Sequence, residues 1–169
     1  RVQAKLVVLH MGAIDMKDYT DRMIDMVGAG LKDSPKYEKL CMEVMEKRES
    51  KKEKYVDLAN ELLARFADEA KSRGIKLGIE NREALEEIPF ESDFTLFFRQ
   101  FPGDTVRYWH DCGHAQIKQN LGFIDHVMHL ESMAEHLHGF HIHDVQFPGR
   151  DHCPPGTGGI DFAALKPFV

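Results

Sequence analysis

The chain has 169 residues, of which 43% are hydrophobic and 30% are charged, and its formal net charge is -6. This composition is typical of a globular protein and excludes collagen-like and intrinsically disordered chains. Its apolar runs fall far short of the roughly 20 residues that cross a bilayer, and no basic segment followed by an apolar one opens the sequence. We therefore expect a cytoplasmic protein that does not associate with membranes.

The cysteines and the net charge exclude further classes of protein. Cys41, Cys112 and Cys153 cannot all pair, and they are too far apart for a CxxC metal site. Free thiols in a reducing compartment are therefore expected. A net negative chain gains no counterion release on DNA or RNA, so we expect no nucleic-acid partner, although a local basic patch would change this.

The first segments predict a strand and a helix. Residues 4–10 are an apolar run that ends in His10, as a buried parallel strand does where it meets its loop. Residues 19–30 carry apolar side chains at helical spacing and close on glycines.

A long helix and a second strand follow. Ser34 and Pro35 are typical of the cap and the first position of a helix, which is expected to run to Gly74. The strand 76–80, with the sequence KLGIE, ends in a carboxylate. An apolar stripe near the end of the helix consists of Leu62, Leu63, Phe66, Ala67 and Ala70.

The second half repeats this alternation. Residues 92–101 carry phenylalanines at helical intervals, residues 106–111 predict a third strand, residues 123–137 an amphipathic helix, and residues 139–143 a fourth strand. The side chains of the amphipathic helix that are expected to face inward are Ile124, Val127, Met128, Leu130 and Leu137.

Strands that alternate with helices of this length build a parallel sheet. The sequence thus predicts an α/β fold with four βα units. Neither a repeat nor a flexible linker divides the chain, so we expect a single domain over residues 1–169.

Polar residues of metal-binding types stand where the four strands end. Because the carboxyl ends of parallel strands lie on one face, these side chains are expected to converge. Imidazoles and carboxylates suit a divalent ion of the manganese, magnesium, cobalt or zinc type. For Glu80 the alternative of capping the next helix stays open. The strand-end residues are His10, Glu80, Asp111, and His141 with His143 and Asp144.

Several histidines are expected to lie away from this face. His110 points to the opposite side of its strand from Asp111. On the helix 123–137 we expect His126, His129 and His136 to be surface or interhelical residues.

The segment Asp111-Cys-Gly-His114 places a histidine three residues after a strand-end carboxylate, across a glycine that permits a tight turn. Asp111 would hold the ion and His114 the substrate, while the alternative for His114 is a hydrogen-bonded loop residue. No base or helix supports Cys112 as a nucleophile.

Residues 150–162, RDHCPPGTGGIDF, form a proline- and glycine-rich loop. Its backbone amides would hold a substrate oxyanion or phosphate. A plain turn before a helix capped by Asp161 explains the pattern equally well.

Five motifs in order resemble the xylose-isomerase-like barrel superfamily, which holds sugar phosphate isomerases/epimerases and type IV apurinic endonucleases. They are LVVLHMG (6–12), GIEN (78–81), DCGHA (111–115), HIHD (141–144) and HCPPGTGGIDF (152–162). The resemblance implies a (β/α)8 TIM barrel, of which the chain would supply only the fourth to seventh strands. Half a barrel leaves two unpaired edges, so the sequence is expected to be a piece of a longer chain, or a homo-oligomer completes the barrel.

The resemblance also implies roles for individual residues. Glu80, Asp111 and His141 would hold the divalent ion together with a further glutamate beyond Val169. Glu80 would remove a proton next to a carbonyl that the ion polarises. The residues implied for the substrate pocket are His114 and His152, which would hold hydroxyls or phosphate, and His10, which would line it.

The expected function is therefore a metal-dependent isomerase or epimerase of a small sugar or sugar phosphate. A rival function is a zinc-dependent phosphoesterase of the endonuclease type, but that branch has an aspartate where Arg150 stands. The motifs are also compatible with a catalytically silent sugar-binding barrel and with a polyol dehydratase.

Overall fold

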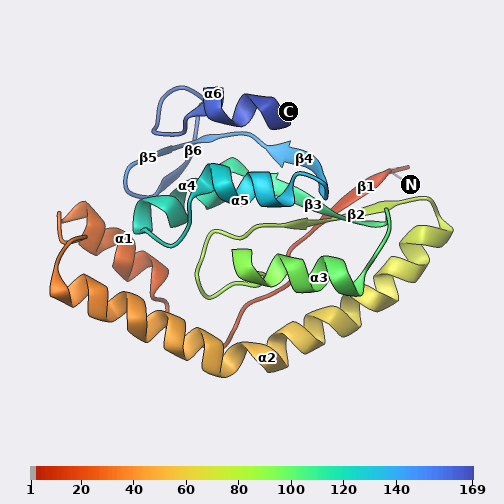
Figure 1. The fold of residues 1–169 in the computed structure, drawn as a ribbon, viewed down its shortest axis with the longest axis horizontal. Coiled ribbons are helices and arrows are strands. Elements are labelled where there is room, and N and C mark those ends of the chain that lie inside the picture. Colours follow the sequence, from red (N-terminus) through yellow and green to blue (C-terminus); the bar gives the residue numbers. More distant parts are fainter. Residues whose placement is uncertain (1–2) are drawn as a thin grey trace.

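The computed structural model of the protein describes residues 3–169. Its main sheet has four parallel strands in the order β1-β2-β3-β4, and an antiparallel pair, β5 and β6, follows (Figure 1). The elements are β1 Leu6–Leu9, α1 Thr20–Gly28, α2 Pro35–Ser72, β2 Lys76–Glu80, the 3-10 turn η1 Glu91–Asp93, α3 Phe94–Gln100, β3 Val106–Asp111, α4 Cys112–Leu121, α5 His126–Met133, β4 Leu137–His141, β5 Asp144–Gln146, β6 Arg150–Cys153, α6 Phe162–Leu165 and η2 Lys166–Phe168.

The parallel sheet that the sequence predicts is confirmed. In register, Glu80 pairs with Trp109 and Asp111 pairs with His141, so the carboxyl ends of β2, β3 and β4 lie at one edge. The fourth strand ends at His141 and not at His143, because the chain leaves the main sheet there to form β5.

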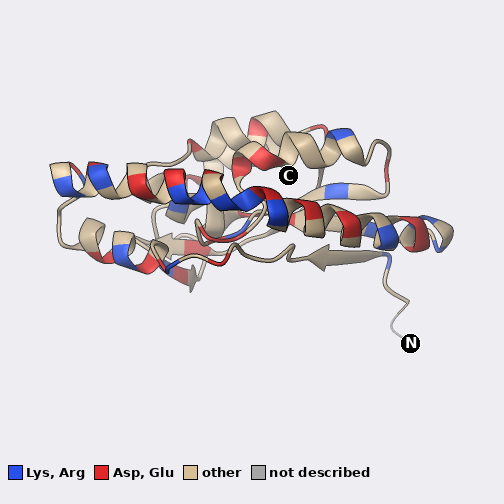
Figure 2. Cartoon of the chain, turned by 90° about the horizontal axis from the view of Figure 1, so that it is seen from below, with Lys and Arg blue, Asp and Glu red and all other residues tan. Residues whose placement is uncertain are grey.

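Helix α2 begins as its sequence predicts and follows one side of the molecule (Figure 1). The Ser34 side chain accepts a hydrogen bond from the Tyr37 amide, and Pro35 takes the first helical position. Acidic and basic residues are interspersed along the helix (Figure 2). Among residues 3–169, no helix has both the length and the apolarity that a membrane span requires.

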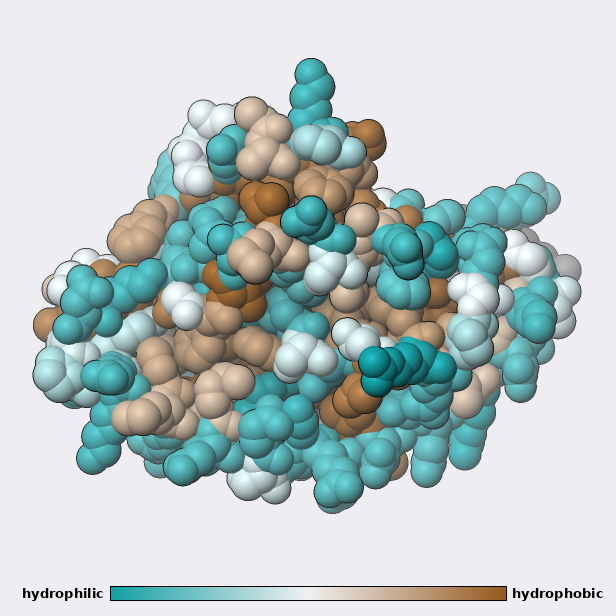
Figure 3. Space-filling view, in the orientation of Figure 1, coloured by the Kyte–Doolittle hydropathy of each residue, from teal (hydrophilic) through white to brown (hydrophobic). Residues whose placement is uncertain are grey.

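The apolar stripe predicted near the end of α2 is wrong in part. Leu63 and Ala70 are buried, but Leu62 and Phe66 are 49% and 47% exposed. Both exposed residues lie on a neighbouring ridge of the helix, outside its contact with the rest of the fold. On the face drawn in Figure 3, hydrophobic patches lie between the hydrophilic side chains that cover most of the surface.

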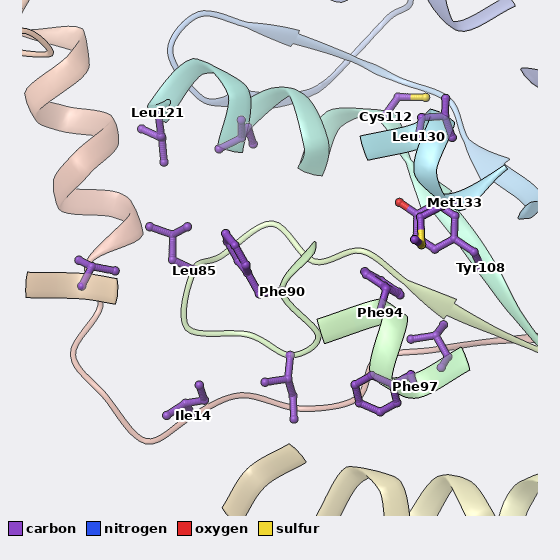
Figure 4. Packing of buried hydrophobic residues seen from close by; sticks show 14 of the residues in the cluster. Ile14, Leu85, Phe90, Phe94, Phe97, Tyr108, Cys112, Leu121, Leu130 and Met133 are labelled. Atoms are coloured by element: carbon purple, nitrogen blue, oxygen red, sulfur yellow. The ribbon is translucent and has the colours of Figure 1, made fainter. Parts of the chain in front are cut away.

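The core lies between the sheet and the helices that cover it (Figure 4). Phe94 and Phe97 of α3 are fully buried, in line with the helical spacing of phenylalanines in this segment. The Phe94 ring meets the Tyr108 ring of β3 edge to face, with centroids 4.9 Å apart. Such a pair contributes about 0.5 to 1.5 kcal/mol beyond its burial. In α5, Leu130 is buried as expected, whereas Met128 is 68% exposed and faces away from the core.

The buried Arg48 of α2 fixes the loop that follows β2. Its guanidinium donates to the carbonyl oxygens of Leu85 and Glu87 at 2.7 and 2.8 Å, and to the Asp93 carboxylate at 2.8 Å. Removing one partner of such a buried pair costs about 3 to 5 kcal/mol. This anchor holds the loop in place beside the end of β2.

On the face of the sheet that the helices cover, a chain of hydrogen bonds joins β3 to α4 and α5. Tyr108 Oη lies 2.8 Å from His110 Nδ1 and 2.9 Å from His129 Nε2. His110 Nε2 lies 2.9 Å from His126 Nε2, and His126 Nδ1 lies 3.3 Å from Gln116 Oε1. His126 and His129 are therefore buried between elements, which excludes a surface position for these two histidines.

The direction of each hydrogen bond in this chain follows from its end on α4. Gln116 donates its amide to Asn120 Oδ1 at 2.9 Å, so Gln116 Oε1 accepts the proton of His126 Nδ1. The remaining bonds then run from His110 Nε2 to His126 Nε2, from the Tyr108 hydroxyl to His110 Nδ1, and from His129 Nε2 to Tyr108 Oη. Each group finds its partner while all three histidines are neutral.

Acid is therefore expected to destabilise the fold. Burial above all lowers the pKa of His126 to about 4 and that of His129 to about 3, whereas both titrate near 6.5 in the unfolded chain. Since the unfolded chain binds protons first, the free energy of unfolding falls between about pH 6.5 and pH 4, by about 1.4 kcal/mol per pH unit for each histidine.

Urea unfolding between pH 7 and pH 4.5 measures this dependence. His129→Gln retains a donor for Tyr108 but does not titrate, so its stability should fall less steeply by about 1.4 kcal/mol per pH unit. Equal slopes in the wild type and the variant would contradict the neutral network.

Candidate functional site

Three hydrogen-bond donors surround the buried carboxylate of Glu80, the last residue of β2. Its Oε1 lies 2.5 Å from His141 Nδ1, and its Oε2 lies 2.8 Å from His10 Nε2 and accepts a hydrogen bond from Arg82. The Glu80 side chain is 2% exposed, whereas those of His10 and His141 are 62% and 45% exposed. Glu80 thus forms the floor of a site that opens on the histidine side.

Asp111 joins the end of β3 to the start of α4. Its Oδ1 accepts the His114 amide at 2.9 Å as an N-cap, and its own amide donates to Asn81 Oδ1 at 2.6 Å. Burial alone would raise the pKa of Asp111, but its interactions with the ring and amide of His114 and the hydrogen bond from His143 lower it below its usual value. The carboxylate is therefore ionised at neutral pH.

The structure brings Glu80, Asp111 and His141 together, although they come from three different strands. His141 Nδ1 lies 2.5 Å from Glu80 Oε1 and 3.5 Å from Asp111 Oδ2. Oxygens of the two carboxylates lie within 4.8 Å of each other. Two carboxylates this close repel unless a cation or donor lies between them, so these groups fit a divalent ion.

His114 lies in the wall of the site. Its Nδ1 donates to the Asn81 carbonyl at 2.8 Å, so only Nε2 remains free to act as a ligand atom, and Nε2 lies 4.0 Å from Asp151. Burial lowers the pKa of His114, which keeps the ring neutral. A neutral imidazole whose other nitrogen donates to a backbone carbonyl is typical of metal-binding histidines, and ligand atoms of Glu80, Asp111 and His114 lie within 4.8 Å of one another. His114 is therefore a candidate third ligand, as is His141.

A second group, His143, Asp151 and His152, lies beside Asp111. His143 Nε2 lies 2.9 Å from Asp111 Oδ1, and its Nδ1 lies 2.9 Å from Asp151 Oδ1. Asp151 Oδ2 lies 2.8 Å from Nδ1 of His152, whose ring stacks on His143 at 4.3 Å. Burial alone would lower the pKa of His143, but the two carboxylates raise it.

The sequence places His143 among the strand-end residues that are expected to converge but gives it no specific role, and it gives no role to Asp151. His143 follows His141 by two residues, and Asp151 precedes His152 directly. Both spacings are visible in the sequence, but the path of β5 and β6, which brings Asp151 back to His143, is not.

Gly113 lies in the first turn of α4 and not in the free turn that the sequence predicts. The helix starts there because Asp111 caps it. A Cβ atom at residue 113 would lie 2.1 Å from His143 Cε1 and 2.4 Å from Asp151 Oδ1, so only glycine leaves room for this pair. Burial and Asp111 raise the pKa of the Cys112 thiol to about 12, which excludes it as a nucleophile at neutral pH, as expected.

The glycine-rich loop does not offer its amides to a ligand as its sequence suggests. The buried Asp144 carboxylate accepts hydrogen bonds from four backbone amides, at 2.8 to 3.1 Å. An internal anion thus occupies the place suggested for a phosphate. The four amides belong to Val145, Gly156, Gly158 and Ile160.

Trp109 lies one pleat below Asp111 on the face of β3 that carries the site. Its ring contacts the neighbouring strand at Gly139, where a Cβ atom would lie 2.2 Å from Cζ3, and meets the His141 ring edge to face at 5.4 Å. The sequence does not predict this packing of Trp109 beside the site.

Comparison with known families shows that residues 4–168 match the family described as "Xylose isomerase-like TIM barrel". A comparison with curated protein sequences finds no significant match.

Solved structures of similar fold include a D-tagatose 3-epimerase-like protein, with 22% identity and a TM-score of 0.53 over 68% of this chain and 43% of the other. A 3-keto-D-glucoside 4-epimerase from E. coli has 18% identity and a TM-score of 0.53, with coverages of 68% and 41%. A D-allulose 3-epimerase from Methylomonas sp. has 20% identity and a TM-score of 0.52, with coverages of 69% and 40%. The chain spans about two fifths of the length of these proteins.

Replacing Asp144 with asparagine is expected to destabilise the loop. The asparagine amide group would face backbone N–H groups that lose their charged acceptor, so the free energy of unfolding should fall by roughly 2 to 3 kcal/mol. Urea unfolding measures the change. Asp161→Asn is the matched control, because asparagine caps α6 about as well as aspartate does. Equal stabilities of the two variants would contradict the anchoring role of Asp144.

Proposed function

The chain belongs to the xylose isomerase-like TIM barrel family, and we propose that it forms part of a sugar isomerase or epimerase that uses one divalent ion. The family and the partial barrel predicted from five sequence motifs are confirmed. The observation that carries the proposal is the meeting of Glu80, Asp111 and His141 at the carboxyl edge of the sheet. Catalytic residues of TIM barrels lie at this edge.

Glu80, Asp111 and His141 would hold the ion through two carboxylates and one imidazole. When bound, the ion would polarise the carbonyl and hydroxyl oxygens of a sugar and stabilise the negative charge of an enediolate. Glu80 would remove the proton next to the carbonyl, and Arg82 and His10, which donate to Glu80 Oε2, would orient its carboxylate. His152, at the exposed rim, and His114, in the wall, would hold substrate hydroxyls.

An unphosphorylated sugar is the substrate class that the site favours. The loop amides that a phosphate would need are held by Asp144. Arg82, the arginine at the floor, is paired with both Glu80 and Glu87. The free sugars in the names of the structural neighbours support the same class.

Glu80→Gln is expected to abolish exchange of solvent deuterium into the carbon next to the carbonyl of a ketose substrate. The amide cannot accept the proton, so the rate should fall by at least about a hundredfold. Proton NMR of a ketose panel with and without phosphate groups measures the exchange. Glu135→Gln, at an exposed position, is the control. Retained exchange in Glu80→Gln would mean that the base lies elsewhere.

A phosphoesterase with several zinc ions is the second candidate, and one observation favours it. Arg150 stands where the endonuclease branch has an aspartate, but the next residue, Asp151, lies beside His143 and His152 and within 4.0 Å of His114. A carboxylate and imidazoles for a further ion are therefore close together.

The metal content of the purified protein separates these two functions. We expect about one divalent ion per chain by inductively coupled plasma mass spectrometry, because Arg150 stands where the endonuclease branch has an aspartate. About three zinc ions per chain, together with cleavage of abasic DNA, would overturn the isomerase proposal in favour of the phosphoesterase.

A further inference from the structure

His143 connects two carboxylates that belong to different parts of the chain. Its Nε2 lies 2.9 and 3.0 Å from the two oxygens of Asp111, and its Nδ1 lies 2.9 Å from Asp151. The side chains of His143 and Asp151 are each only 12% exposed. The His143 ring and the Asp151 carboxylate both pack against the backbone of Gly113.

Three contacts thus fix the plane of the His143 ring. Asp151 Oδ1 lies 2.9 Å from the ring's Nδ1 as a close ionic contact without hydrogen-bond geometry, the ring of His152 stacks on it within 6° of parallel, and the backbone of Gly113 packs against its Cε1 atom. An imidazole held in this way can direct its Nε2–H at Asp111 without further loss of side-chain entropy. Asp111 in turn keeps an oxygen toward His141, 3.5 Å away.

We propose that His143 is a positioning residue, which orients the Asp111 carboxylate for cation binding and is itself oriented by Asp151. This inference rests on the proposed function, because it assigns a task to Asp111 as a ligand. Groups that hydrogen-bond to metal ligands typically change metal affinity by 10- to 100-fold when they are removed. His143 and Asp151 would act on the ion only through Asp111.

Titration of the metal-free protein with Mn²⁺, followed by electron paramagnetic resonance, tests the inference without any measurement of activity. His143→Leu removes the donor and should weaken Mn²⁺ binding by 10- to 100-fold. His143→Gln places an amide nitrogen where Nε2 lies and should stay within about threefold of the wild type. Asp151→Asn keeps His143 but weakens its support, so an intermediate loss of about three- to tenfold is expected.

His138→Leu is the matched control, since His138 lies on β4 but is exposed and outside the site. It should bind Mn²⁺ like the wild type. Circular dichroism and urea unfolding without metal establish that each variant is folded. A merely structural role would reduce stability in His143→Leu and leave the affinity of the folded fraction unchanged.

The outcomes separate the inference from the proposed function. A wild type that does not bind Mn²⁺, Co²⁺, Zn²⁺ or Mg²⁺ overturns the proposed function, and the inference falls with it. A wild type that binds Mn²⁺ while His143→Leu binds equally well overturns the inference alone. If His143→Leu does not fold, near-normal binding by His143→Gln with weakened binding by Asp151→Asn supports the inference. If His143→Gln and Asp151→Asn both bind Mn²⁺ as tightly as the wild type, the inference is overturned.

Discussion

The geometry of the site depends on the carboxylate of Asp111. This group ends β3, caps α4 through the His114 amide and accepts a hydrogen bond from His143 beyond β4. The backbone of Asp111 is bonded in both directions to the side chain of Asn81, the residue after Glu80. The carboxylate and the backbone of this one residue together connect the ends of β2, β3 and β4 with the start of α4. A change in the orientation of the Asp111 carboxylate would therefore change the positions of Glu80, His143 and any ion bound between them.

The convergence of Glu80, Asp111 and His141 could be predicted from the sequence because it follows from topology. Strands that alternate with helices must run parallel, and parallel strands bring their carboxyl ends to one edge. No contact between particular side chains has to be known for this step. The same reasoning located His10 beside Glu80. The catalytic and ligand roles of these residues are a matter of chemistry and remain proposals.

Contacts that depend on the path of a loop could not be predicted. Asp151 reaches His143 only because β5 and β6 turn back toward α4, and Asp144 takes the loop amides for the same reason. Helix α4, Cys112–Leu121, was not predicted, because its first residues, Cys-Gly-His, are poor helix formers, and the cap by Asp111 outweighs this. On α2, the apolar stripe extends to Phe66, beyond the face that the helix buries, so hydrophobicity alone overestimates the core there.

The two faces of β3 separate two kinds of polar chemistry. On the helix side, burial lowers the pKa of His110 well below its usual value, so the histidines there are neutral and satisfy one another. On the opposite side, Asp111 is ionised and surrounded by donors. Adjacent residues of a strand point to opposite faces, so the sheet itself keeps His110 away from the Asp111 carboxylate. The neutral network can therefore secure α5 to the sheet without adding positive charge at the site that we propose for a cation.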